Sequence, residues 1–252
     1  MEGIELGLFM ISACLFVALL EYPPSPVHQA LPDATIRRVL IGLAMGATAV
    51  AIIYSPLGQR SGAHFNPAVT LTFWRLGKIV SWDALGYTVF QFIGGTVGVV
   101  LSALVLGMII AAPTVNYAVT VPGPDGLMVA FVAEATISFV QMSLVLHLAN
   151  TQRFAKYTGY FAGLMVAMYI SLEAPYSGMS MNPARTFASA FPAQLWTAWW
   201  IYFTAPPLGM LLAAELYLHQ RGLHKVFCAK LHHHNDRRCI FRCNYEELVD
   251  KN

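Results

Sequence analysis

Two short stretches decide the fold of this chain: residues 61–70, SGAHFNPAVT, and residues 177–186, SGMSMNPART. They carry Ser, Gly, Asn, Pro, Ala and Thr at identical offsets, so one is an internal copy of the other. A single Asn-Pro-Ala is an ordinary helix start, because Asn suits the N-cap and Pro suits the first helical position. Two copies in one shared frame indicate a repeated structural unit instead.

Long apolar stretches surround the two copies, at about 4–20, 38–56, 84–112, 128–149, 158–172 and 195–218. A membrane-spanning helix needs about 20 mostly apolar residues. The 252-residue chain is 57% hydrophobic and 11% charged, whereas soluble domains carry roughly 25% charged residues. Too few charges remain to coat a soluble surface, and the basic residues are not clustered as a nucleic-acid partner would require. The composition predicts an all-α protein of the lipid bilayer.

The order of these segments predicts an inverted repeat. Each Asn-Pro-Ala copy follows the second apolar stretch of a group of three, so the halves 1–112 and 128–219 enter the membrane from opposite sides. The segments 61–77 and 177–192 are too short to span. We expect six transmembrane helices plus two re-entrant half-helices, at about 67–76 and 183–191, in a channel domain of residues 1–219. A polar, basic tail, 220–252, follows.

Half-helices that begin inside the membrane predict a pore. Their first amides have no partner and carry partial positive charge. Irregular backbone at that depth is tolerated only where it is buried in protein or lines a water-filled cavity. Two such loops that meet from opposite faces form a path lined by carbonyls and by two Asn amides.

Charge sets the expected orientation. With the N-terminus inside, twelve Lys and Arg residues fall on the inner side and two, Arg37 and Arg38, on the outer side. The positive-inside rule then places both termini in the cytoplasm and the protein in the cell membrane. Arg37 and Arg38 run against this trend.

The paired motifs resemble those of the aquaporin family (major intrinsic proteins), over about residues 4–218. The resemblance implies a right-handed helix bundle, a homotetramer with one pore per subunit, and passage of water or another small neutral solute. Close helix crossings would use small residues such as Gly42/Gly46 and Gly159/Gly163. The membrane region shows no paired carboxylates, activated nucleophile or metal triad, so we expect neither an enzyme nor a cofactor. The implied pore midplane comprises Asn66, Pro67, Ala68, Asn182, Pro183 and Ala184.

The resemblance also implies a selectivity constriction formed by Met45, Ile170, Met179 and Arg185. Gly46 is an alternative to Met45, and a fixed ion pair with Glu173 is an alternative role for Arg185. An Arg inside a membrane span has a functional role by default. The implied pore-lining carbonyls belong to Gly62, Ala63, His64, Gly178, Met179 and Ser180.

The resemblance further implies that a buried glutamate braces each pore loop. In the second half this is Glu134, unless Glu134 is only a helix-end charge. In the first half the counterpart is Glu5. If the first apolar stretch is instead aligned with the family on residues 15–17, Phe9 takes that position.

The solute remains open between water and larger neutral molecules. The ring of Met45, Ile170 and Met179 lacks the aromatic residue and the His that water channels usually place there. Thr186, Ala190 and the pair Tyr202-Phe203, in contrast, follow the water-channel pattern. We therefore favour water, with glycerol or another small uncharged solute as the alternative. A coupled secondary transporter is a remote alternative, and a structural membrane protein with a closed pore is another.

The tail carries His and Cys residues that could bind a metal. Clustered His and Cys suit zinc or a similar soft cation, which could close a structural site or gate the pore. The expected ligands are His232, His234, Cys239 and Cys243. The alternative is a basic membrane-proximal tail that binds no metal.

Overall fold

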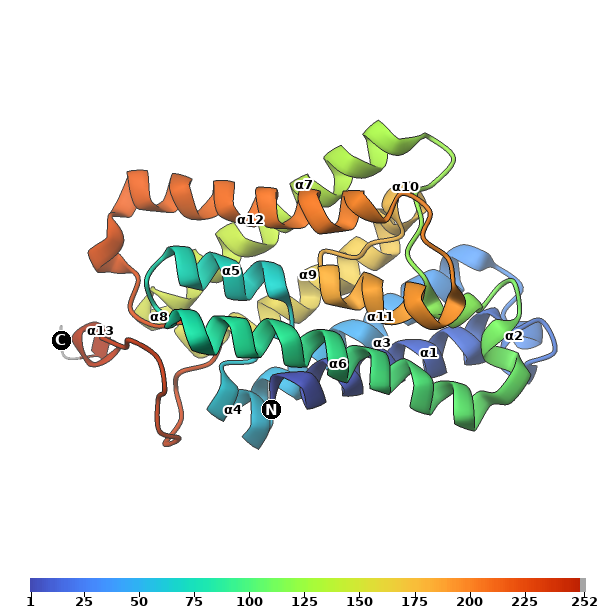
Figure 1. Ribbon diagram of the computed structural model, residues 1–252, viewed down its shortest axis with the longest axis horizontal. Coiled ribbons are helices and arrows are strands. Elements are labelled where there is room, and N and C mark those ends of the chain that lie inside the picture. The colour runs from blue at the N-terminus through green and yellow to red at the C-terminus, as the bar shows by residue number, and fades with distance from the viewer. Residues whose placement is uncertain (250–252) are drawn as a thin grey trace.

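The computed structural model describes residues 1–249 as a bundle of six long helices with shorter helical segments between them (Figure 1). Five of the long helices are long and apolar enough to cross a membrane, and α9 is a shorter apolar helix. This confirms the all-α membrane fold. The long helices are α1 (Glu2–Glu21), α3 (Ala34–Tyr54), α6 (Ser81–Leu106), α7 (Leu127–Ala149), α9 (Thr158–Leu172) and α12 (Trp199–Arg221).

Short helices complete the described chain. Two of them, α5 (Pro67–Arg75) and α11 (Pro183–Ala193), are the half-helices that follow the two Asn-Pro motifs. The others are α2 (Pro26–Ala30), α4 (Pro56–Ser61), η1 (Gly107–Ala111), η2 (Asn116–Ala118), α8 (Gln152–Ala155), α10 (Ala174–Ser177), η3 (Leu223–Lys225) and α13 (Glu246–Val249).

The half-helices lie end to end in the interior of the bundle, with their N-termini facing each other (Figure 1). Asn66 caps α5 by accepting a hydrogen bond from Ala68 N at 2.8 Å, and Asn182 caps α11 by accepting one from Ala184 N at 3.0 Å. Proline follows each cap at the first helical position. The local sequence therefore fixes where both half-helices start.

Helices α3 and α9, which come from different halves, cross through glycine. A Cβ on Gly46 would lie 2.5 Å from the carbonyl oxygen of Gly163, and one on Gly163 would lie 2.6 Å from that of Gly46. No other residue type permits this approach, because real Cβ atoms do not come so near to backbone. Gly46 therefore serves the contact between the halves.

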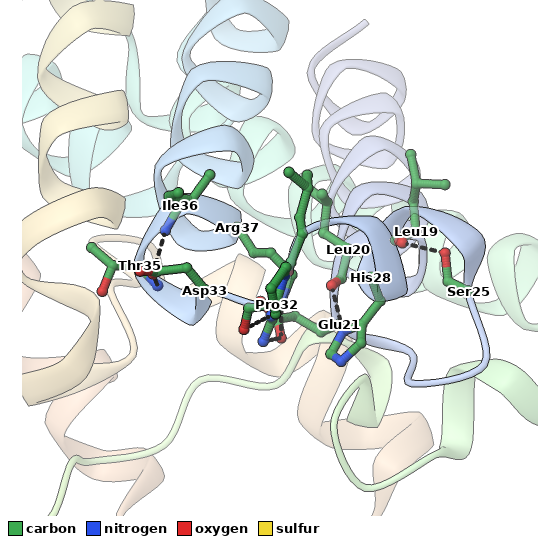
Figure 2. Close-up of polar contacts among 11 residues, drawn as sticks. Leu19, Leu20, Glu21, Ser25, His28, Pro32, Asp33, Thr35, Ile36 and Arg37 are labelled. Atoms are coloured by element: carbon green, nitrogen blue, oxygen red, sulfur yellow. Dashed lines mark hydrogen bonds and ion pairs between the residues drawn. The ribbon is translucent and has the colours of Figure 1, made fainter.

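In the loop between α1 and α3, the charge of Arg37 is paired with Glu21 (Figure 2). This buried guanidinium donates to the Glu21 carboxylate at 3.1 and 3.2 Å and to the carbonyls of Leu31 and Pro32 at 2.8 Å. Asp33 caps α3 by accepting hydrogen bonds from Thr35 N and Ile36 N. Arg37 is thus a structural residue of the loop, which explains why it departs from the charge trend.

Candidate functional site

The two Asn-Pro-Ala loops meet through reciprocal hydrogen bonds. Asn66 Nδ2 donates to the Met181 carbonyl at 2.7 Å, and Asn182 Nδ2 donates to the Phe65 carbonyl at 2.8 Å. Each amide nitrogen carries two hydrogens, so these bonds leave the second N–H of each Asn for a guest molecule. The junction holds both donors at the facing ends of α5 and α11.

In the second half the buried Glu134 holds the loop that leads into α11. The Glu134 carboxylate accepts from Ser180 N at 2.6 Å, from Met181 N at 2.7 Å and from Ser177 Oγ at 2.9 Å. It is fully buried. A carboxylate that holds two successive amides fixes the loop conformation between them.

In the first half these contacts are divided between two glutamates. The backbone amides of His64 and Phe65 donate to the Glu2 carboxylate at 3.0 and 2.6 Å. Glu5, the expected brace, accepts instead from the Ser61 hydroxyl at 2.6 Å. Glu2 is therefore the equivalent of Glu134 in its amide contacts. Its place one residue from the chain start gave no sequence signal for this role.

Both loops use left-handed backbone at matching offsets. Ala63 has φ 58° and Met179 has φ 52°, and two residues later Phe65 has φ 30° and Met181 has φ 53°. Non-glycine residues adopt such angles at a cost of about 1–3 kcal/mol each. The glutamate contacts offset this cost, so the strain is confined to the segment that leads into each half-helix.

A cavity of about 550 Å³ opens on the side of the junction where Arg185 lies; we call it the vestibule. The four predicted constriction residues, Met45, Ile170, Met179 and Arg185, all line it, together with Asn66 and Asn182. Gly46, the alternative to Met45, contacts Gly163 instead. The structure thus brings the predicted side chains together around one space.

Arg185 keeps a free donor within this region. Its Nη1 is buried and has no hydrogen-bond partner within residues 1–249, and the carboxylate oxygens of Glu173 are likewise unpartnered. The alternative of a fixed Arg185–Glu173 ion pair is therefore absent from the described chain. A buried, unpaired guanidinium N–H beside a cavity can donate to a polar guest.

A second cavity of about 80 Å³, the inner chamber, lies on the other side of the junction. It shares four lining residues with the vestibule and is otherwise bordered largely by apolar side chains. Leu231, from the tail, is one of them. The residues that line both cavities, and so lie between them, are Phe65, Asn66, Val166 and Met181.

The tail, residues 222–249, covers the mouth of the inner chamber. Leu231 N donates to the carbonyl of Gly62 at 3.1 Å, so this predicted pore-lining carbonyl is already paired. His64 Nε2 lies 2.9 Å from the Ala229 carbonyl, and the Phe241 ring stacks on His64 with 5.6 Å between centroids. The tail residues 226–232 are buried. We call this covered opening the tail-side mouth.

A group of potential metal ligands lies in the same tail. The ligand atoms of Cys228, His233, Cys239 and Cys243 all lie within 4.8 Å of one another. Two predicted ligands, Cys239 and Cys243, belong to this group. The other two, His232 and His234, do not, and Cys228 and His233 take their places.

The structure gives His232 a different neighbour. The His232 ring instead lies 4.5 Å from that of Tyr54. The clustering of His and Cys in the sequence could suggest a metal site, but it could not show which of the adjacent histidines lies near the thiols.

Two comparisons of the sequence with known proteins agree on one family. The sequence profile described as "Major intrinsic protein" matches residues 6–217. Aquaporin NIP6-1 of Arabidopsis thaliana is 38% identical over 180 residues, which are 71% of this chain and 57% of that protein. The probable aquaporin AqpM of Archaeoglobus fulgidus is 37% identical over 185 residues, or 70% of this chain and 74% of that protein.

A solved structure shows the same fold. The aquaglyceroporin from Plasmodium falciparum superposes with a TM-score of 0.70 at 18% identity, covering 86% of this chain and 92% of that one. The chain spans less than two thirds of the plant relative's length.

Proposed function

Because this chain belongs to the major intrinsic protein family, whose members are membrane channels and not enzymes, we propose that it conducts water and excludes ions and protons. The observation that carries the proposal is the junction of the two half-helices. There, Asn66 and Asn182 each hold one amide hydrogen in a bond to the opposite loop and leave the other free. Two such donors suit the oxygen of a water molecule that passes between them.

The exclusion of charge has two supports. The N-termini of α5 and α11 face the junction, and the partial positive charge of a helix N-terminus repels cations. Arg185 adds a full positive charge beside the vestibule, and its Nη1 has no partner in the described part of the chain. A proton or metal cation would meet both fields, whereas a neutral molecule meets only hydrogen-bond donors.

Glycerol or another small uncharged solute is the second candidate, because of the vestibule wall. Met45, Ile170 and Met179 give it flexible apolar side chains opposite the Arg185 donor. A molecule with hydroxyls on one side and carbons on the other suits such a lining. Water is favoured because Thr186, Ala190 and Tyr202 match the water-channel pattern. Here Tyr202 also supports the loop by donating to the Ser177 carbonyl at 2.6 Å.

The setting of the channel is part of the same proposal. We place it in the cell membrane with both termini in the cytoplasm, which makes the tail-side mouth the cytoplasmic opening. We also infer a homotetramer, with one complete pore in each subunit. The many apolar side chains on the outer faces of the helices would contact lipid or neighbouring copies.

Stopped-flow light scattering on proteoliposomes tests the solute. Wild type is compared with Leu231→Ala, which thins the cover of the inner chamber, and with Val166→Trp, which fills the passage between the cavities. We expect shrinkage of the wild type under an impermeant osmolyte, faster in Leu231→Ala and abolished in Val166→Trp, and little re-swelling in a glycerol gradient. Rapid glycerol re-swelling would support the second candidate. Absence of flux from both wild type and Leu231→Ala would refute the channel proposal.

A further inference from the structure

The four grouped tail side chains have the geometry of a tetrahedral metal site. Cys228 Sγ lies 3.5 Å from Cys239 Sγ, and His233 Nε2 lies 3.0 Å from Cys243 Sγ. Zinc bonds of about 2.3 Å to sulfur and about 2.0 Å to nitrogen give tetrahedral edges of roughly 3.5–3.8 Å. The observed separations, all within 4.8 Å, need only small shifts to surround one ion. A disulfide, in contrast, would need sulfur atoms at about 2.05 Å.

The donor set selects the class of ion. Three thiols and one imidazole are soft ligands that favour Zn²⁺ and exclude hard cations such as Mg²⁺ and Ca²⁺. Four protein ligands leave no open position, which is the arrangement of structural rather than catalytic zinc. Three thiolates on Zn²⁺ leave one net negative charge. Basic residues of the tail surround the ligands in sequence and can balance it, namely Lys230, Arg237, Arg238 and Arg242.

We propose that Cys228, His233, Cys239 and Cys243 bind one Zn²⁺, and that this ion holds the tail over the tail-side mouth. The ligands bracket the residues that close the opening. Leu231, which lines the inner chamber, lies between Cys228 and His233, and Phe241, which stacks on His64, lies between Cys239 and Cys243. One ion therefore fixes both closing residues at once.

The remaining polar contacts of the tail with the bundle are few, and an apolar face adds to them, because Val226, Ala229 and Leu231 belong to the buried core. Arg242 N donates to the Lys78 carbonyl at 3.0 Å, and Phe227 N donates to Asn150 Oδ1 at 2.8 Å. Lys230 Nζ, although buried, donates within the tail to the Arg237 carbonyl. The segment lacks a helix or strand between Lys225 and Glu246. Because the ligands flank both Leu231 and Phe241, we expect loss of the ion to weaken this attachment enough for the tail to leave the mouth, so that the pore opens. This consequence rests on the proposed channel function, whereas the metal site does not.

The site itself is tested on the full-length protein in detergent, without any flux measurement. Chelated protein is titrated with Co²⁺ and then with Zn²⁺. We expect one Co²⁺ per chain, with the thiolate charge-transfer absorption of a tetrahedral site, which Zn²⁺ then abolishes. Cys239→Ser/Cys243→Ser and, independently, His233→Ala should lose this spectrum. His234→Ala and Cys14→Ser are matched controls outside the group, and both should retain it. The site would be overturned if the wild type failed to bind one Co²⁺ per chain. It would also be overturned if His233→Ala and His234→Ala lost the cobalt spectrum equally.

Whether the bound Zn²⁺ holds the tail over the tail-side mouth is tested by water permeability in the same variants. Chelation should raise the wild-type permeability several-fold, and Zn²⁺ should reverse the rise. Cys239→Ser/Cys243→Ser should be permanently permeable and insensitive to zinc, whereas Leu231→Ala should be permeable yet retain the cobalt spectrum. If the wild type binds the metal but its water permeability is the same with and without it, the ion does not close the tail-side mouth. If no variant conducts, the channel proposal fails, and the cobalt spectrum still decides the site.

Discussion

At the scale of single residues, Glu2 and Glu5 have neighbouring positions but different roles. Glu2 accepts from two backbone amides of the pore loop and from Gln91 Nε2 at 2.7 Å. Within residues 1–249, Glu5 accepts from one hydroxyl and its Oε2 has no hydrogen-bond partner. The substitution Glu2→Gln replaces one acceptor oxygen by an NH₂ group that faces the amide donors.

We expect Glu2→Gln to cost about 1–3 kcal/mol of stability, the usual penalty for a buried donor left unpaired. It should also reduce water permeability, because the loop between Gly62 and Asn66 loses its anchor. Glu134→Gln should behave alike, while Glu5→Gln should cost clearly less. Thermal unfolding in detergent and stopped-flow permeability measure the two effects. A larger loss for Glu5→Gln than for Glu2→Gln would contradict the assignment of Glu2 as the brace.

Ile170 is the residue at which the vestibule can be made polar. It lines the same cavity as Met45, Met179 and Arg185. Ile170→His removes apolar surface for the carbon side of glycerol and adds a group that competes with the Arg185 donor. We expect glycerol re-swelling, where the wild type shows any, to fall by about tenfold or more, as expected for the loss of an apolar contact. Water flux should change less. Ile170→Leu is the control, and an equal fall in both fluxes would argue against selection at this position.

At the scale of elements, the sequence predicted the helices whose positions are set by neighbouring residues. The half-helices were expected at 67–76 and 183–191 and occur at 67–75 and 183–193, because an Asn cap followed by Pro marks a helix start unambiguously. The six apolar stretches match the six long helices for an equally local reason. Glu2 and the ligands Cys228 and His233 were missed because their roles depend on distant segments. Glu2 contacts residues more than 60 positions away, and the tail has no periodic pattern that assigns faces.

The crossing of α3 and α9 gives a prediction about elements. A methyl group on Gly46 would meet the Gly163 carbonyl, whereas a Cβ on Gly86, within α6, would meet nothing within 4 Å. Gly46→Ala should therefore destabilise the protein by about 1–3 kcal/mol through overpacking. Gly86→Ala should be neutral or stabilising by up to about 1 kcal/mol, because alanine favours helix over glycine. Unfolding temperatures of the two variants, measured side by side, check this. Equal destabilisation would mean that the two halves do not rely on this contact.

At the scale of the whole molecule, the two sides of an inverted repeat differ because of what is appended to one of them. The half-helices, their caps and their braces are matched across the junction, yet one side holds a vestibule of about 550 Å³ and the other a chamber of about 80 Å³. The tail accounts for part of this difference, since Leu231 borders the small chamber. The tail follows the second half alone, so it can cover only the mouth on its own side.

The side on which the tail lies decides which compartment can act on it, and this sets the last prediction. Twelve basic residues favour the tail side as the cytoplasmic one, and the charge of Arg37, on the other side, is neutralised by Glu21. A membrane-impermeant maleimide, applied with a chelator, should label the native tail cysteines in inside-out vesicles and leave them unlabelled in intact cells. Cys14 is buried in α1 and should not react.

The matched reporter for the opposite face is Asp125→Cys, placed in a chain whose three tail cysteines are replaced by serine. Asp125 is exposed in the loop before α7, and its cysteine should label in intact cells. Labelling of the tail in intact cells would reverse the orientation. In that case extracellular rather than cytoplasmic zinc would have to hold the tail-side mouth closed.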